Sequence, residues 1–231
     1  MLKKIFFLII TLNFCSAFAS VTINKTRVIF NESDNISTVT LNNNNTSSSI
    51  VQIWVDEGDV NVNPSKIDVP FIISPQIKIL NEKQSQVVKI KYIGENTIDG
   101  EELYWLNVLE IPKNNKSSKN HIQLAYRTRI KFFLRASSLS GLSQSDSAEK
   151  LNFTFRDGKI SIENSSPFHI TVTGLFLNRE GGETVLVDEG FVIKPKSIEE
   201  INIENIESIE SFKYEYINDW GGKVEVLREA S

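Results

Sequence analysis

Cysteine is almost absent from this chain of 231 residues, because its only cysteine is Cys15. Cys15 lies in the first 19 residues, where Lys3 and Lys4 precede an apolar run and Ala17-Phe18-Ala19 supplies the small residues that a signal peptidase recognises. The pattern is typical of a secretory signal peptide and is too short for a transmembrane anchor. We expect cleavage after Ala19, and therefore a mature chain that has no disulfide in an oxidising compartment.

An excess of positive charge is also missing. The chain has 25 Lys and Arg against 29 Asp and Glu, and loss of Lys3 and Lys4 leaves 23 against 29, a net charge of −6. This balance argues against a nucleic acid as partner. No later segment approaches the length of a membrane span, so we expect a soluble mature chain that does not insert into a membrane. About 210 residues suffice for one large or two modest domains, which burial alone must stabilise.

Motifs of catalysis and metal binding are absent as well. The two histidines, His121 and His169, have no cysteine or carboxylate at metal-ligand spacing, and no GxSxG, HExxH or glycine-rich phosphate loop occurs. Gly181-Gly182 and Gly221-Gly222 lie between apolar runs and indicate hairpin turns. We therefore expect a binding protein without enzymatic activity, cofactor or metal.

Helical periodicity is nearly absent, and short β-rich runs dominate. Seven predicted strands occupy Val21–Phe30, Ser37–Leu41, Ile50–Val55, Phe71–Ile73, Val87–Ile93, Leu103–Ile111 and His121–Leu134. A second series occupies Leu151–Phe155, Lys159–Ile162, His169–Leu177, Glu183–Val187, Phe191–Ile193, Phe212–Ile217 and Lys223–Leu227. The sequence thus predicts an all-β protein with two β-sandwich domains, residues 20–136 and 151–231.

The segment between the two series, residues 137–150, is serine-rich and predicts a linker. One ambiguity lies in the second domain, where isoleucines recur every third residue from Ile203 to Ile209, before Phe212. This spacing is also compatible with a short helix.

The stretch HIQLAYRTRIKFFLRA, residues 121–136, has a long apolar face and a basic one. Alternate residues from Ile122 to Leu134 are apolar apart from Thr128, and the opposite face carries Arg127, Arg129, Lys131 and Arg135. Such a strand is an aggregation hazard at a sheet edge unless a helix, a loop or a partner covers it.

Five stretches together resemble the periplasmic pilus chaperones of the chaperone–usher pathway. They are Lys25–Phe30 (KTRVIF), Gly100–Pro112 (GEELYWLNVLEIP), the 121–136 stretch, Glu163–His169 (ENSSPFH) and Asn218–Gly222 (NDWGG), in the order and spacing of the family. The resemblance implies two immunoglobulin-like domains in an L-shaped arrangement. It also implies a periplasmic protein that folds and caps pilus subunits by donor-strand complementation and delivers them to an outer-membrane usher, without a cofactor.

Two departures accompany the resemblance. Ala136 stands where the family usually has proline, which predicts a less rigid domain junction. The connection Lys113–Asn120 is short and has no flanking cysteine pair, which implies the short-loop subclass that serves rod-like pili.

By motif position, the resemblance makes Ile122, Leu124 and Tyr126 the side chains that fill the groove of a subunit. Alternation alone instead favours burial of all three in the core of their own domain. The resemblance leaves Ile130, Phe132 and Leu134 as core residues.

The resemblance also implies roles for charged residues. Arg27 and Lys131 would grip the C-terminal carboxylate of the subunit in the cleft between the domains; without the resemblance, both would be ordinary surface cations in ion pairs. Glu101, Arg135 and Asp219 would form a charge cluster that bridges the domains. Arg127 and Arg129 receive no role, and we expect them to form a solvated face.

Two other classes of protein remain as alternatives. A structural pilus subunit or adhesin usually has one disulfide-bonded domain, whereas this mature chain has two domains and no cysteine. A secreted carbohydrate-binding sandwich needs exposed aromatic residues on loops, whereas Trp54 and Trp105 lie in predicted strands and only Trp220 lies in a turn. The sequence leaves open whether two free copies cap each other as a dimer.

Overall fold

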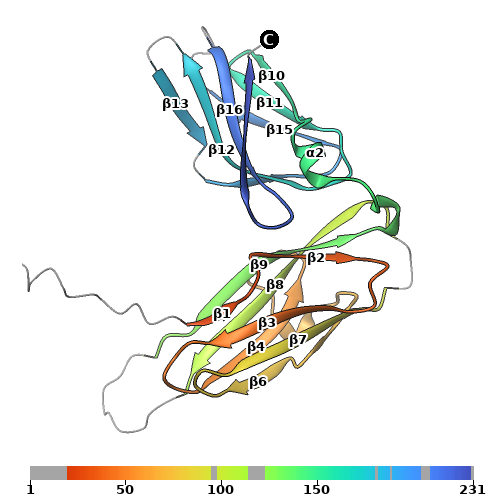
Figure 1. The fold of residues 1–231 in the computed structure, drawn as a ribbon, viewed down its shortest axis with the longest axis vertical. Helices are drawn as coiled ribbons and strands as arrows, with labels where there is room; N and C mark the ends of the chain where they lie inside the picture. Colours follow the sequence, from red (N-terminus) through yellow and green to blue (C-terminus); the bar gives the residue numbers. More distant parts are fainter. Residues whose placement is uncertain are drawn as a thin grey trace, which may run out of the picture.

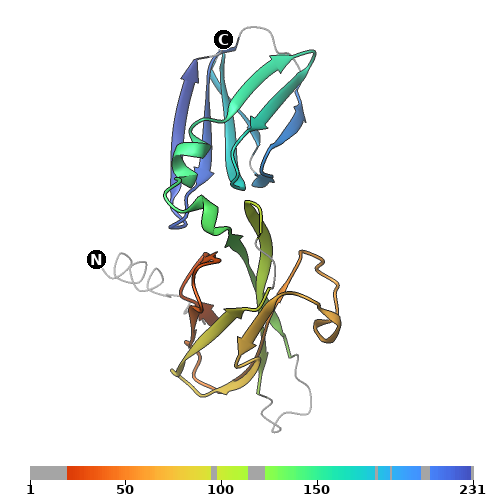
Figure 2. The ribbon, with the colours of Figure 1, turned by 90° about the vertical axis from the view of Figure 1, so that its right-hand side faces the viewer.

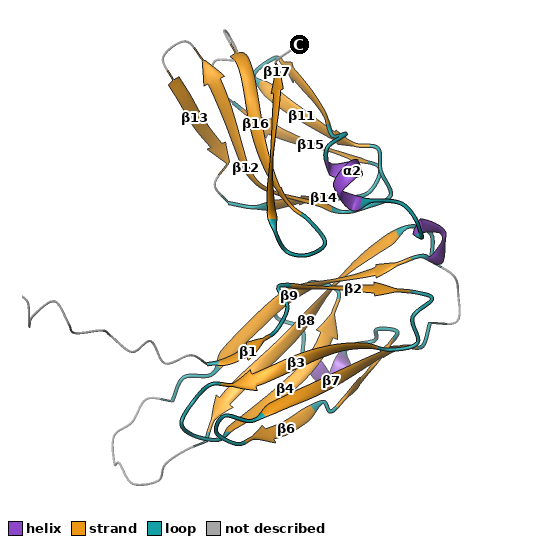
Figure 3. Ribbon diagram, viewed as in Figure 1, coloured by secondary structure: helices purple, strands orange, loops and turns teal. Residues whose placement is uncertain are grey.

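The computed structural model describes residues 20–94, 98–113, 123–179, 182–187, 189–203 and 209–229. These residues form two β-sandwiches that meet at an angle in an L-shaped arrangement (Figure 1). Strands make up nearly all the regular structure, with only short helical segments between them (Figure 3). The predicted signal peptide, residues 1–19, lies outside the described residues.

The first sandwich consists of two sheets that face each other. One sheet has the order β1 (Val21–Ile23), β3 (Ser37–Asn43), β7 (Ser85–Tyr92), β5 (Phe71–Ser74). The other has the order β2 (Arg27–Asn31), β9 (Tyr126–Arg135), β8 (Glu101–Pro112), β4 (Ser49–Asp56), β6 (Ile77–Leu80). A 3₁₀ helix, Pro64–Lys66, lies between β4 and β5.

The predicted strand Val21–Phe30 is in fact two strands that belong to different sheets. β1 pairs with β3 in one sheet, and β2 pairs with β9 in the other, after the chain has crossed over at residues 24–26. The β2–β9 pairing is parallel, whereas the other strand pairs are antiparallel. Strand β6 was not predicted, because it is a four-residue edge strand whose first three side chains are all exposed.

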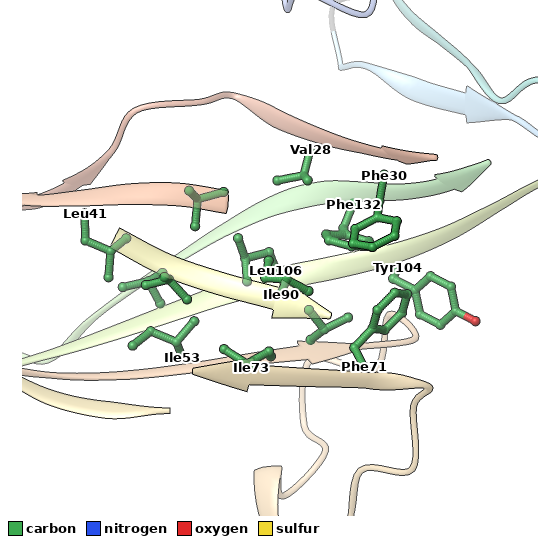
Figure 4. Packing of buried hydrophobic residues seen from close by; sticks show 14 of the residues in the cluster. Val28, Phe30, Leu41, Ile53, Phe71, Ile73, Ile90, Tyr104, Leu106 and Phe132 are labelled. Atoms are coloured by element: carbon green, nitrogen blue, oxygen red, sulfur yellow. The ribbon is translucent and has the colours of Figure 1, made fainter. Parts of the chain in front are cut away.

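Aromatic side chains fill one end of the first core (Figure 4). The Phe71 ring lies 4.8 Å from that of Phe132 and 5.0 Å from that of Tyr104, both in edge-to-face geometry, and Phe30 contacts Phe71 and Phe132. Such pairs each contribute about 0.5–1.5 kcal/mol beyond the burial of their area. Burial of this kind stabilises a domain that has no disulfide.

The second sandwich has its own hydrophobic core. Its strands form two sheets (Figure 2). One sheet has the order β10 (Asn152–Arg156), β11 (Lys159–Asn164), β15 (Ser197–Asn202). The other has the order β13 (Gly182–Val187), β12 (Ile170–Arg179), β16 (Ile209–Ile217), β17 (Lys223–Glu229), and β14 (Phe191–Ile193) also pairs with β12.

Sequence reasoning missed β15, since only one side of this acidic strand is partly buried. The helical alternative is wrong for Ile209–Phe212, which belong to β16, and residues 204–208 lie outside the described residues. The predicted hairpin at Gly221-Gly222 is confirmed, since these residues join β16 to the antiparallel β17 and Gly221 has a φ of +80°. Gly182 begins β13 opposite Arg179, and Gly181 lies outside the described residues.

The segment predicted as a linker is folded against the second domain. It contains a 3₁₀ turn, Ser137–Leu139, and the short helix α2, Gln144–Ala148, and both Leu139 and Ala148 are buried in the second core. Ala136 donates its backbone N–H to the carbonyl of Gly100 at 2.9 Å, a bond that a proline could not make. Within the described part of the chain, no helix is long and apolar enough to cross a membrane.

Candidate functional site

Strand β9 is paired on both sides along only half of its length. Lys131–Arg135 lie between β2 and β8, whereas Tyr126–Ile130 pair with β8 alone. Among the described strands, none pairs with the other edge of residues 126–130, so the backbone groups of that edge are available to a further strand. Unpaired edges of this kind are templates for strand addition.

The apolar side chains along this segment divide into two groups. Leu124 is 56% exposed and Tyr126 is 52% exposed, whereas Phe132 and Leu134 are fully buried in the first core. The alternative that Leu124 and Tyr126 face their own core is therefore wrong, and Ile122 lies outside the described residues.

The strand itself is shorter than the predicted His121–Leu134. It begins at Tyr126, Gln123–Ala125 precede it without strand structure, and residues 121 and 122 lie outside the described residues.

Arg27 and Lys131 lie side by side where the first domain contacts the second. They are register partners in the parallel β2–β9 pair. The Lys131 ammonium donates to the Thr171 hydroxyl at 3.1 Å, and the Arg27 guanidinium donates to the Ile217 carbonyl at 3.2 Å. Thr171 and Ile217 are register partners in the β12–β16 pair. A pair of neighbouring residues in the first domain therefore hydrogen-bonds to a pair of neighbouring residues in the second.

The electrostatics of these two cations favour an anion. Neither forms a salt bridge with a described carboxylate, and the Arg27 Nε is buried without a hydrogen-bond partner. Burial and, to a lesser degree, the neighbouring Arg27 lower the pKa of Lys131 to about 8, and burial also lowers the pKa of Arg27. The surface ion pairs that would be expected without the resemblance are therefore not formed by the described residues.

Glu101, Arg135 and Asp219 are brought together at the domain junction. Arg135 contacts Glu101 through Nε at 2.6 Å and grips Asp219 of the second domain with both terminal nitrogens, each at 2.6 Å. Burial alone would lower the pKa of Arg135, but the hydrogen bonds and charges of Asp219 and Glu101 outweigh it and raise that pKa. The Phe168 ring lies 4.8 Å from the guanidinium.

His169 completes this cluster, a role that sequence reasoning missed. Its backbone N–H donates to Glu101 at 2.7 Å, and its Nδ1 lies 3.1 Å from the same carboxylate oxygen. The His169 contact uses a backbone N–H, which no side-chain pattern can predict. The position of His169 at the end of the ENSSPFH motif was the available signal.

A hollow of about 530 Å³ opens beside Arg27 and Arg135. Lys25, Arg27 and Ile29 line it from β2 and the residues before it, and Asp219 and Trp220 line it from the β16–β17 turn. Trp220 is 94% exposed, while Figure 1 shows its turn directed at β2.

Arg127 and Arg129 are not the free cations of a solvated face that was expected, although 27% of the Arg127 side chain and 17% of the Arg129 side chain remain exposed. Both are ion-paired with Asp56, at 3.2 and 2.7 Å, and each guanidinium lies over a tryptophan ring, Trp54 for Arg127 and Trp105 for Arg129. The Asp56 side chain is only 2% exposed.

Comparisons with known proteins agree with this architecture. Residues 20–140 match the family model of the pili and flagellar-assembly chaperone, PapD N-terminal domain, and residues 146–227 match the pili assembly chaperone PapD, C-terminal domain. The chain is thus a two-domain, all-β, non-enzymatic chaperone by class, and it belongs to the PapD family of periplasmic pilus-assembly chaperones.

Individual relatives span nearly the whole chain. The chaperone protein MrkB of Klebsiella pneumoniae is 33% identical over 94% of this chain and 97% of its own length. The probable fimbrial chaperone YadV of Escherichia coli K12 is 32% identical over 91% of this chain and 89% of its own. The crystal structure of the Pseudomonas aeruginosa CupB2 chaperone superposes with a TM-score of 0.73 at 26% identity, covering 90% of this chain and all of that one.

Proposed function

We propose that this protein binds, folds and caps pilus subunits by donor-strand complementation and delivers them to an outer-membrane usher. The observation that carries the proposal is the half-open strand β9. Its free edge begins at the exposed Tyr126, just after the exposed Leu124, and leads toward Arg27 and Lys131, neither of which forms a salt bridge with a described carboxylate. A subunit that lacks a strand would receive main-chain hydrogen bonds from that edge and apolar side chains from its outward face. Relatives named as fimbrial chaperones support pilus subunits as the partners.

The carboxylate anchor follows from the same geometry. The C-terminal carboxylate of a subunit would be bound by Arg27 and Lys131, where it would satisfy the unpartnered Arg27 Nε and offset the burial of both charges. The cluster of Glu101, Arg135 and Asp219 would hold the angle between the domains without contacting the subunit. Binding would need no ATP or cofactor, since subunit folding itself would be coupled to strand addition, and strand exchange at the usher would release the subunit.

Export and domain division complete the proposal. We assign residues 1–19 to a signal peptide cleaved after Ala19, supported by a family match that begins at residue 20. We keep residues 20–136 as the subunit-binding domain, 137–150 as the connector and 151–231 as the second domain. The short-loop subclass remains a prediction from Lys113–Asn120, of which only Lys113 is described.

The test of the strand is a pair of matched substitutions, scored by recovery of a fimbrial subunit co-expressed in the periplasm. Leu124→Glu should weaken subunit binding roughly tenfold to a hundredfold, because full burial of such a side chain is worth about 1.5–3 kcal/mol. The melting temperature should not change, since Leu124 is 56% exposed. Ile72→Glu, at an equally exposed position of β5 (52%), is the control and should recover subunit as the wild type does. Equal recovery with both variants would refute the proposal.

A further inference from the structure

One face of strand β9 carries three cations in addition to Arg135, which is already paired with Glu101 and Asp219. Arg127, Arg129 and Lys131 alternate along the strand, and a slip of two residues keeps every side chain on its face. The terminal carboxylate of a partner strand could therefore bind at any of three positions along β9, those of Arg127, Arg129 and Lys131. Arginine is the stronger competitor, because its planar guanidinium binds a carboxylate with two parallel hydrogen bonds.

Asp56, at the end of β4, occupies the two arginines. Its Oδ1 accepts from Arg129 at 2.7 Å and from the Gly58 N–H at 2.9 Å. Its Oδ2 accepts from Arg127 at 3.2 Å, from Asn107 at 2.8 Å and from the Trp54 indole at 3.3 Å. One buried carboxylate thus forms ion pairs with two neighbouring cations.

Trp54 and Trp105 also contact the two arginines that pair with Asp56. The Arg127 guanidinium lies 5.0 Å from the Trp54 ring, and the Arg129 guanidinium lies 4.4 Å from the Trp105 ring. Trp105 is directly opposite Lys131 in the β8–β9 pair, and the ammonium lies 5.9 Å from its ring. Lys131 is thus next to the network but has no carboxylate in it.

Arg129 retains the capacity to bind an anion. Its Nε is buried without a hydrogen-bond partner, as is the Nε of Arg27. The two arginines differ in their ion pairs. Asp56 forms a salt bridge with Arg129, whereas Arg27 forms none with a described carboxylate and is influenced by the nearby charges of Asp219 and Glu101.

We propose that Asp56 determines the register of strand addition. It occupies Arg127 and Arg129, and among the described residues of β2 and β9 it leaves Lys131 with Arg27 as the open anchor for the carboxylate of a partner strand. This inference rests on the proposed function. Asp56 is a specificity-determining residue that does not contact the partner.

The probe is a synthetic strand of alternating valine and serine that ends in a free carboxylate, with its C-terminal amide as the control ligand. Wild-type protein should bind the carboxylate peptide roughly tenfold to a hundredfold more tightly than the amide peptide, since a hydrogen bond to a charged group is worth about 1.5–3 kcal/mol. Lys131→Gln should largely abolish this preference. In the double variant Asp56→Asn with Lys131→Gln the preference should return, because the released Arg129 now binds the carboxylate.

Register itself can be mapped by disulfide cross-linking, since the mature chain has no cysteine of its own. Thr128→Cys is combined with peptides that carry one cysteine at successive positions. In the double variant Asp56→Asn with Lys131→Gln the position of maximal cross-linking should move by two residues from its wild-type position. An unmoved maximum together with no return of the carboxylate preference would overturn the inference.

A measurement on the wild type keeps the inference testable if Asp56→Asn does not fold. The carboxylate peptide should shift the side-chain Nε–H signal of Arg27 in nitrogen-15 NMR spectra and leave those of Arg127 and Arg129 unchanged. A carboxylate-dependent shift of the Arg129 signal would refute the role of Asp56. Equal affinity of wild type for the two peptides would instead refute the carboxylate anchor of the proposed function.

Discussion

If Lys131 binds a carboxylate as proposed, its lowered pKa should make that binding sensitive to mildly alkaline pH. In the free protein, burial and the nearby Arg27 lower the Lys131 pKa to about 8. A bound carboxylate favours the charged ammonium and raises that pKa, so binding above pH 8 requires the uptake of a proton. At pH 9 roughly a tenth of the free protein carries the charge, and the affinity for the carboxylate peptide should be about tenfold lower than at pH 7, equivalent to about 1.4 kcal/mol.

The assay is a titration of the carboxylate peptide between pH 7 and pH 9, with proton uptake measured by calorimetry in buffers of different ionisation enthalpy. Lys131→Arg is the matched control, because a guanidinium stays charged throughout this range and its affinity should be flat with pH. The amide peptide should also show no dependence. A wild-type affinity that is equal at pH 7 and pH 9, or an identical fall in Lys131→Arg, would refute the reasoning.

Loss of binding in this range should not reflect unfolding. The folded-state pKa of Lys131, about 8, is below the ordinary value of 10.5, so the unfolded chain binds more protons between these two pH values. The contribution of this group to stability therefore rises as the pH increases through that window. A melting curve recorded at each pH separates the two effects.

Two further predictions concern the domain junction. Arg135→Ala should lower the free energy of unfolding by about 3–5 kcal/mol, because it leaves the buried Glu101 carboxylate without its cation. Asp219→Asn should lower it much less, because the Asp219 side chain is partly exposed. Equal losses for the two variants in urea titrations would contradict this. Gly221→Ala should lower the melting temperature and change the angle between the domains, because Gly221 has a φ of +80° and an added Cβ would collide with the Thr26 hydroxyl. An unchanged small-angle X-ray scattering profile and an unchanged melting temperature would contradict this.

The sequence was sufficient for the two sandwiches, because alternating apolar runs and turn residues are local signals. It was insufficient for the crossing at residues 24–26, since both halves of Val21–Phe30 have strand character and only packing decides which sheet each half joins. Strand β15 was missed for a related reason, because its half-buried acidic pattern resembles that of a polar loop.

The site was predictable in part, and through resemblance more than through pattern. The positions of Arg27 and Lys131 came from motifs, whereas their pairing in register depends on a parallel contact between strands about 100 residues apart. The role of Asp56 could not be predicted, because its partners Arg127 and Arg129 are remote in sequence and no local carboxylate marks them as paired. A single sequence does not indicate which charged residues of different strands form ion pairs in the folded protein.

The point at which the chain crosses from β1 to β2 determines how many residues of β9 keep a free edge. Because β2 begins at Arg27, opposite Lys131, it covers β9 only from that level onward and leaves Tyr126–Ile130 with a free edge. A crossing two residues earlier would let β2 cover the Arg129 level as well, and a later one would uncover part of the core strand. Arg27, which begins β2, is also one of the two cations of the proposed carboxylate anchor. In the proposed function, a single step in the backbone would therefore set both the length of β9 that is lent and the point at which a partner strand ends.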